Sequence, residues 1–188
     1  DISYYKLIRK SRKLLNVKLI GYTAFENLYC NRIRNVNIGN NVITPCGGIS
    51  NIYDISINKP ELNDTFFVPN YHNDTIMMDL SKHLNNIGIK SVGKVKYNGP
   101  NDLLNYKGII HIPYAWSNLA FFEGLQLGIV YFIPSINFLY EIIKDKSFFW
   151  SPPFYKNLII YSEWYNATFN KYIIKFDSWK DLNTKIDN

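Results

Sequence analysis

The chain has 188 residues, a 47% apolar share and a formal net charge of +6. This length supports one sizeable core or one domain with an appendage, and the apolar share argues against general disorder. No apolar run reaches the roughly 18 residues of a membrane span, no signal-like segment opens the chain, and Cys30 and Cys46 lack metal-ligand spacing. We therefore expect a cytoplasmic protein with free thiols, no metal and no membrane span.

Positive charge is concentrated near the start, in the run KLIRKSRKLLNVK that begins at Lys6. Ile and Leu stand between its charges at helical spacing. Because the run lacks interleaved aromatics and a recognisable binding motif, it favours a solvated helix face over a nucleic-acid or membrane patch. We expect no nucleic-acid partner, although the charge is compatible with the phosphate groups of a small ligand.

The first part of the chain is short of structure for a domain of its own. A stretch rich in Gly, Pro, Asn and Asp, residues 45–64, marks the best boundary, and we divide the chain into residues 1–44 and 45–188. The few elements before the boundary cannot bury both faces of a sheet, so they must lean on the second part or on residues absent from this chain. They are a helix over 3–15, a short strand over 17–23, a helix over 25–33 capped by Thr23, and a strand over 40–45.

The second part alternates strands with helices along its whole length. Strands separated by helical segments predict right-handed crossovers and a parallel sheet covered on both faces, a Rossmann-like doubly wound α/β fold. Ser178 and Asp181 fit a capping box at the last helix. The expected strands are 65–70, 89–95, 108–114, 129–135 and 171–176, and the expected helices are 74–88, 99–108, 117–128, 137–150 and 177–186.

Ligands of such sheets bind beyond the carboxyl ends of the strands, where helix N-termini point free amides. The run YAWSNL lies at one such end, so with Ser117 as N-cap the amides of Ser117, Asn118 and Leu119 suit a phosphate. For an isolated Ser, simple helix capping is the more common role. At the other strand end, His72 and Asn73 precede a helix in the same way, although a lone His is more often structural or exposed.

Glu123 is an unusual carboxylate in the apolar helix of HIPYAWSNLAFFEGLQLGIVYFIPS, which starts at His111. It lies too far from the cap to satisfy the first amides, and it can accept hydrogen bonds from the two hydroxyls of a ribose. A surface Glu on an amphipathic helix is the alternative that spacing alone favours. Gly124 leaves room for a close approach, and Gly128 suits a helix C-cap.

Two segments, VITPCGG from Val42 and EGLQLG followed by IVYFIPS, resemble the GT-B fold glycosyltransferases. The resemblance implies that residues 45–188 are the donor half, with Glu123 holding the ribose of a nucleoside-diphosphate sugar. The amides of 117–119 would grip the diphosphate, and TFFVPNYHN would supply the first strand and loop. FDSWKDL, from Phe176, looks like the closing segment of small transferases of large DNA viruses, which implies the host cytoplasm.

The same resemblance implies the partners and the reaction of the chain. The donor sugar would pass to a glycan, protein or lipid acceptor without a cofactor or a required metal, and an N-terminal GT-B domain would precede this part in a longer chain. Ala115 stands where retaining members carry a glutamate, so the catalytic residues and the stereochemistry stay unassigned. The alternative is a non-catalytic nucleotide- or carbohydrate-binding module of the same fold, with Trp116, Trp150 or Trp164 as a stacking surface.

Overall fold

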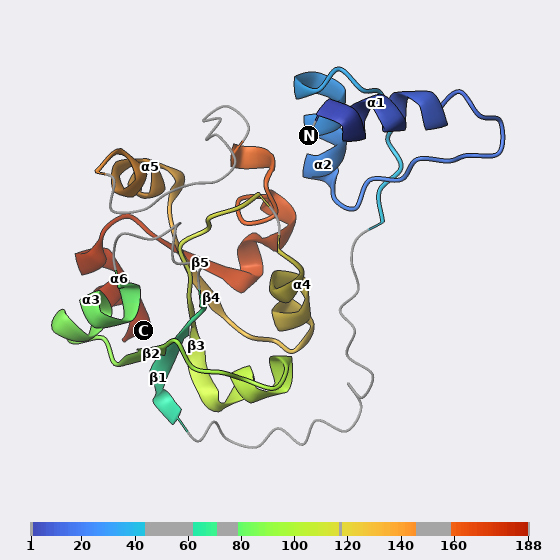
Figure 1. Ribbon diagram of the computed structural model, residues 1–188. Helices are drawn as coiled ribbons and strands as arrows, with labels where there is room; N and C mark the ends of the chain where they lie inside the picture. The colour runs from blue at the N-terminus through green and yellow to red at the C-terminus, as the bar shows by residue number, and fades with distance from the viewer. Residues whose placement is uncertain (1, 44–61, 71–78, 117, 146–158, 188) are drawn as a thin grey trace.

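Five short strands pair in parallel in the order β2-β1-β3-β4-β5 (Figure 1). The computed structural model describes residues 2–43, 62–70, 79–116, 118–145 and 159–187. The chain is α/β, and its parallel sheet is compatible with the predicted Rossmann-like fold. The strands are β1 Leu62–Val68, β2 Ser91–Gly93, β3 Tyr106–Ile110, β4 Tyr131–Pro134 and β5 Ile173–Phe176.

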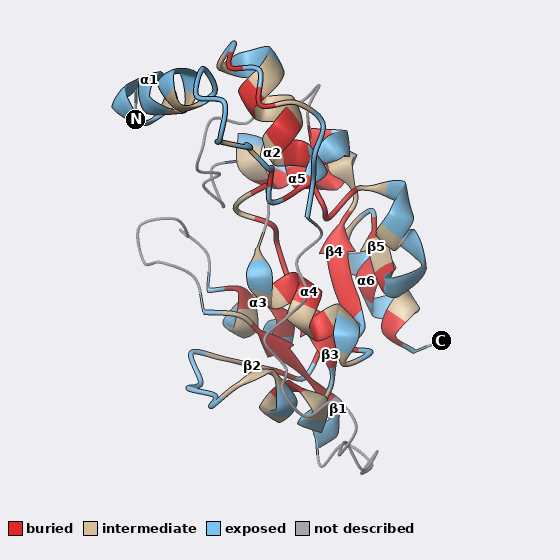
Figure 2. Ribbon diagram, turned by 90° about the vertical axis from the view of Figure 1, so that its right-hand side faces the viewer, coloured by how far each residue is buried: buried red, intermediate tan, exposed pale blue. Residues whose placement is uncertain are grey.

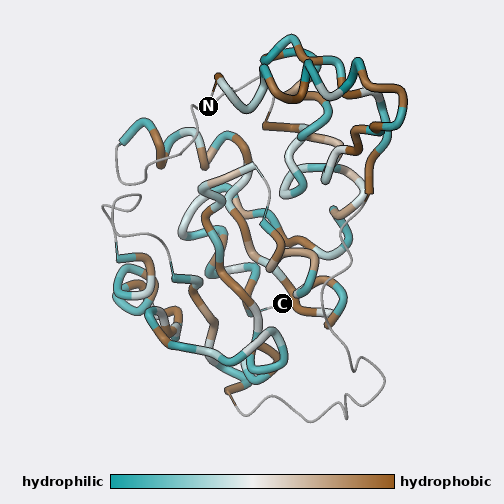
Figure 3. The backbone as a smooth tube through the Cα atoms, turned by 45° about the vertical axis from the view of Figure 1, so that its right-hand side comes forward, coloured by the Kyte–Doolittle hydropathy of each residue, from teal (hydrophilic) through white to brown (hydrophobic). Residues whose placement is uncertain are grey.

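The central strands are buried because their sequences are apolar without interruption. All four residues of β4 are buried, as are the last four of β1, and the strands in the middle of the molecule are brown in Figure 3. β4 pairs with β3 through Ile109 and Tyr131 and with β5 through Phe132 and Ile174. A strand covered on both faces has no solvent-exposed side, so polar residues do not alternate with apolar ones along its sequence. This explains the continuous apolar runs.

Helices cover both faces of the sheet. Figure 1 shows α3 and α6 on one side and α4 on the other. The rings of His83 and Trp179, 4.7 Å apart, join α3 to α6, whereas those of Phe121 and Phe169, 5.5 Å apart, join α4 to η5. These elements are α3 Leu80–Asn86, α4 Leu119–Gln126, α5 Ile136–Lys144, α6 Trp179–Ile186, and the 3-10 helices η3 Pro100–Asn105, η4 Ile159–Tyr161 and η5 Ala167–Tyr172.

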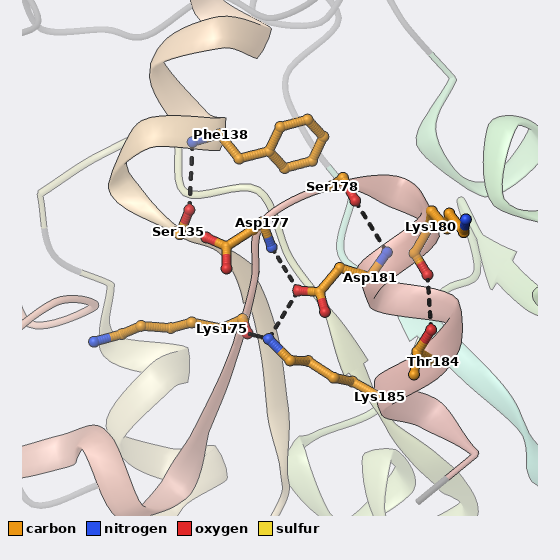
Figure 4. A network of polar contacts seen from close by, with 9 residues as sticks. All are labelled: Ser135, Phe138, Lys175, Asp177, Ser178, Lys180, Asp181, Thr184 and Lys185. Atoms are coloured by element: carbon orange, nitrogen blue, oxygen red, sulfur yellow. Dashed lines mark hydrogen bonds and ion pairs between the residues drawn. The ribbon is translucent and has the colours of Figure 1, made fainter.

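The last helix begins with the predicted capping arrangement (Figure 4). The Ser178 hydroxyl accepts a hydrogen bond from the amide of Asp181 at 3.0 Å, and the Asp181 carboxylate accepts one from the amide of Asp177 at 2.7 Å. Lys185 donates to the same carboxylate at 2.8 Å and to the carbonyl of Lys175 at 2.7 Å. The contacts satisfy helix-end donors and tie α6 to the end of β5.

The N-terminal segment, residues 2–43, contains α1 Ile2–Ser11, α2 Ala24–Leu28 and a π-helical turn, η1 Tyr29–Ile33. Thr23 caps α2 as predicted, because its hydroxyl accepts from the amide of Glu26 at 3.1 Å. The predicted strand over 17–23 is wrong, and within the described residues only a single parallel bridge joins Gly21 to Val42. One bridge cannot order the β-rich run beside it, since a strand needs a continuous neighbour for its backbone groups.

This segment packs on the sheet domain through the buried ring of Phe25 and the partly buried side chains of Leu28 and Tyr29, as its shortage of elements predicted. Phe25 belongs to the main core and stacks on Trp116, with ring centroids 4.4 Å apart and planes at 15°. A second, small cluster of Cys30, Val36 and Ile38 lies inside the segment. Figure 2 contrasts the exposed helix α1 with the buried strands.

Candidate functional site

The sheet order places a topological switch point between β1 and β3. From β1 the chain crosses first to β2 on one side and then to β3 on the other, so a crevice opens beyond the carboxyl ends of β1 and β3. Both segments singled out in the sequence follow these two strands. His72, Asn73 and Ser117 lie outside the described residues, so the structure places Asn118, Leu119 and Glu123 of the predicted set.

Helix α4 starts at this crevice, and its N-cap is Asn118. The Asn118 side chain accepts from the amide of Ala120 at 3.0 Å, and its carbonyl accepts from the amide of Phe121 at 3.2 Å. The prediction of Ser117 as N-cap is wrong by one residue, because Ser and Asn are equally good caps and stand side by side. The amide of Leu119 makes no hydrogen bond to a described residue and stays available as a donor.

A cavity of about 400 Å³ lies between the start of α4 and the N-terminal segment. Asn118 and Leu119 form its wall on the side of the sheet domain. Aromatic walls with a few polar groups are typical of small-molecule sites. No sequence pattern indicates the opposite wall, which consists of Tyr4, Tyr5, Tyr22, Thr23, Phe25, Glu26, Tyr29 and Cys30.

Glu123 shares the outward face of α4 with Leu119, one turn nearer the N-terminus. Phe121 and Gly124 form the buried face. Glu123 is not among the residues that line the 400 Å³ cavity, but side chains on a helix tilt toward its N-terminus, which brings its carboxylate nearer to Leu119 at the cavity wall. It is half-buried and accepts no hydrogen bond from any described residue, which leaves its oxygens available to a ligand.

The charges of three carboxylates reach the Tyr22 hydroxyl. Glu26 lies in the same segment as Tyr22, whereas Glu123 and Glu163 lie in the sheet domain. Desolvation, followed by the charges of Glu123, Glu163 and Glu26, raises the pKa of Tyr22 above its ordinary value. Glu26 also accepts the Tyr22 amide at 2.6 Å. Glu163 is buried and lines a smaller cavity of about 180 Å³ with Thr23. Glutamates from distant parts of the sequence therefore face the same tyrosine.

Two lysines follow β2 at the same edge of the sheet. The Asn70 side chain donates to the carbonyl of Val95 at 3.3 Å, so residues 94–96 lie next to the end of β1. Lys94 forms an exposed ion pair with Asp79, the N-cap of α3, at 2.9 Å. Lys96 is exposed and carries a positive charge at the edge where a phosphate would approach.

The two glycines near Glu123 have structural roles. A Cβ at Gly124 would clash with the Tyr131 hydroxyl, which donates to the carbonyl of Ala120 at 3.0 Å. Tyr131 therefore takes the space that Gly124 leaves. Gly128 has a φ of 75° at the end of α4, which confirms its predicted place at the C-terminus of that helix.

Two of the tryptophans considered as an exposed stacking surface are buried. Trp116 is 6% exposed and Trp164 is 2% exposed, so that prediction is wrong for both, and Trp150 lies outside the described residues. Trp164 donates to the carbonyl of Ala115 at 3.1 Å and packs on Phe121. Both rings pack inside the protein, and neither presents a face to a ligand.

No family model, curated protein or solved structure matches the chain. Within the described ranges, no helix is long and apolar enough to cross a bilayer. Among the same residues, no group of three or more His, Cys, Asp or Glu side chains is placed to hold a metal ion.

Proposed function

We propose that this chain is the donor-binding half of a glycosyltransferase, which transfers a sugar from a nucleoside-diphosphate sugar to a glycan, protein or lipid acceptor. The observation that carries the proposal is the position of Glu123 and the Leu119 amide on one face of α4, at the switch point of a parallel sheet. A carboxylate that accepts from vicinal hydroxyls and an amide that donates to a phosphate are the groups that a nucleotide requires.

The diphosphate lies at the start of α4 in this scheme. The Leu119 amide and the positive end of the helix dipole face it, and Lys96 adds charge from the opposite side of the crevice. Glu123, one turn along the helix, takes the ribose. The tyrosines of the N-terminal segment enclose the remaining space and supply flat surfaces for a base or a sugar ring.

Catalysis then consists of positioning the sugar and stabilising the departing diphosphate. The bond from the anomeric carbon to the diphosphate breaks while a bond to the acceptor oxygen forms. Preorganised donors at the helix terminus act where negative charge grows on the leaving group. The scheme uses no metal and requires none.

Isothermal titration with UDP and GDP tests the proposal. Glu123→Ala removes the hydrogen-bond acceptor for the ribose, so we expect the affinity to fall at least about tenfold. Glu141→Ala is the matched control, because Glu141 is an exposed glutamate on another helix, α5, and it should bind like wild type. Absence of binding by the wild-type chain to every nucleoside diphosphate would contradict the proposal.

A non-catalytic binding module is the second candidate, and the aromatic wall of the 400 Å³ cavity favours it. Such a module binds sugars or nucleotides by stacking and does not depend on Glu123. Binding of free sugars that survives Glu123→Ala, with no release of UDP or GDP from any nucleotide sugar, is the result expected of the module. Release of the nucleoside diphosphate is the result expected of the transferase.

A further inference from the structure

The net charge of the chain comes entirely from its N-terminal part. Residues 2–43 hold eight Lys and Arg residues and a single acidic residue, Glu26. Residues 44–188 balance 13 Lys and Arg with 13 Asp and Glu. This uneven distribution gives the N-terminal part a positive electrostatic potential, which attracts negatively charged surfaces. The net charge of the whole chain does not reveal where that potential lies.

The positive side chains gather around a cavity at the C-terminal end of α1. This cavity, of about 510 Å³, is lined by Arg9, Arg12, Lys13 and residues 35–37, with no acidic side chain in its wall. Arg9 is fixed in place because its guanidinium donates to the carbonyl of Arg34 at 2.8 Å. The arrangement suits a phosphate group.

Large aliphatic side chains are exposed beside this cavity. Helix α1 has no buried residue, and it touches the small inner cluster only through the partly buried Tyr5 and Ile8. Leu7 is 61% exposed, and Leu14 and Leu15, in the turn after the helix, are 56% and 107% exposed. Figure 2 shows the exposure of the helix along its length.

Basic and apolar side chains together on a surface helix and the turn after it fit a lipid bilayer better than a nucleic acid. The positive groups meet lipid phosphates, while the leucines enter the boundary between headgroups and acyl chains. A nucleic-acid backbone offers the same phosphates but no apolar layer for Leu14 and Leu15. The exposed helix α1 agrees with the expectation of a solvated face, and the leucines that are not used for packing are the reason to consider a bilayer as its partner.

We propose that α1 and the turn after it, residues 2–15, dock on anionic membrane surfaces, with a lipid phosphate in the cavity of Arg9, Arg12 and Lys13. The docking is peripheral and does not depend on the proposed transferase activity. Docking holds the chain at a bilayer and so limits its binding partners to molecules near that bilayer.

Co-sedimentation of the full chain with vesicles tests the proposal. We expect the wild type to bind vesicles that contain phosphatidylserine and to leave vesicles of phosphatidylcholine unbound. Arg12→Glu with Lys13→Glu should lower the partition coefficient at least twentyfold, since each charge near an anionic surface contributes about fivefold. Lys144→Glu with Lys180→Glu, two exposed lysines elsewhere, is the matched control and should bind like wild type.

Leu14→Ser with Leu15→Ser separates membrane docking from simple phosphate binding. Both side chains are exposed, so the fold should be retained, which circular dichroism checks. We expect binding to anionic vesicles to fall at least fivefold while its dependence on salt is unchanged. Full binding by this variant, binding of wild type to nucleic acid but not to vesicles, or a dimer that these serines dissociate would each overturn the proposal.

Discussion

The sheet domain and the N-terminal segment are held together by different amounts of packing. Among the described residues, 28 are buried in the main core, of which 27 come from residues 62–187 and the remaining one is Phe25. The inner cluster of the N-terminal segment has three. The same chain thus combines a firmly packed scaffold with a lightly attached segment.

This difference bears on the candidate site, because each region supplies one wall of the cavity. The scaffold fixes Asn118, Leu119 and Glu123 through helix α4, whereas the segment contributes tyrosines and Thr23. A ligand in this cavity contacts a rigid wall on the sheet domain and an adaptable wall on the N-terminal segment. Sites of this kind close around a ligand when the lightly held part moves.

Removal of a ring from the main core should have the largest effect on stability. Phe121 is fully buried against Trp164 and Tyr131, so we expect Phe121→Ala to lower the free energy of unfolding by about 4 kcal/mol. Urea denaturation followed by circular dichroism measures this. Leu119→Ala, at an exposed position two residues away, should change stability by no more than about 0.5 kcal/mol. Equal effects of the two changes would contradict the assignment of faces on α4.

Acid should destabilise the scaffold through His111. Burial lowers the pKa of His111 to about 3 from its ordinary value of 6.5. Between these values the unfolded chain binds a proton that the folded chain excludes, so stability falls as pH drops below about 6.5. The slope approaches about 1.4 kcal/mol per pH unit below pH 6, and the loss between pH 6.5 and 4.5 is about 2.3 kcal/mol.

Urea titrations at several pH values test this prediction. His111→Phe should flatten the slope between pH 6.5 and 4.5, whatever it does to stability itself. The wild-type chain, titrated in parallel, is the reference for the slope. A slope that persists in His111→Phe would show that other groups cause it.

Overpacking behind Glu123 should have the next largest effect. Gly124→Ala brings a methyl group against Tyr131, and we expect a loss of about 2 kcal/mol in the free energy of unfolding. Tyr131→Phe in the same chain removes the closest atom and should recover part of that loss. Purely additive effects of the two substitutions would mean that these residues do not touch.

The smallest global effect is expected for Phe25→Ala, although its local effect is large. Loss of the ring frees the N-terminal segment from Trp116, while the sheet keeps its own core. We expect less than about 1 kcal/mol in global unfolding but faster amide exchange across residues 24–38. Exchange that accelerates equally in the strands would contradict the separation between the two regions.

The order of the five strands and of helices α3 to α6 follows from sequence pattern, whereas the run predicted as a helix over 99–108 is the 3-10 helix η3 followed by the start of β3. Continuous apolar runs such as IVYFIPS can be satisfied only in the middle of a covered parallel sheet, and Thr23, Ser178 and Gly128 mark helix ends by local chemistry. These features depend on neighbours within a few residues, so a single sequence contains them.

The remaining features depend on contacts between residues distant in sequence. No local signal tells that Tyr131 fills the space at Gly124, or that Trp116 is buried under Phe25. The β-rich run over 17–23 lacks a continuous partner strand among the described residues, so its propensity alone could not order it. Glu123 stands out in the sequence because it is a carboxylate in an apolar helix. The opposite wall of the cavity has no such signal and is seen only in the fold.

The position of a nucleotide on α4 is the central claim, and nuclear magnetic resonance tests it most directly. A titration of the nitrogen-15 labelled chain with UDP or GDP reports on each amide. We expect the largest shift changes at Leu119 and its neighbours at the start of α4, with little change at α5 or α6. Shifts confined to other helices, or none at saturating nucleotide, would contradict the account.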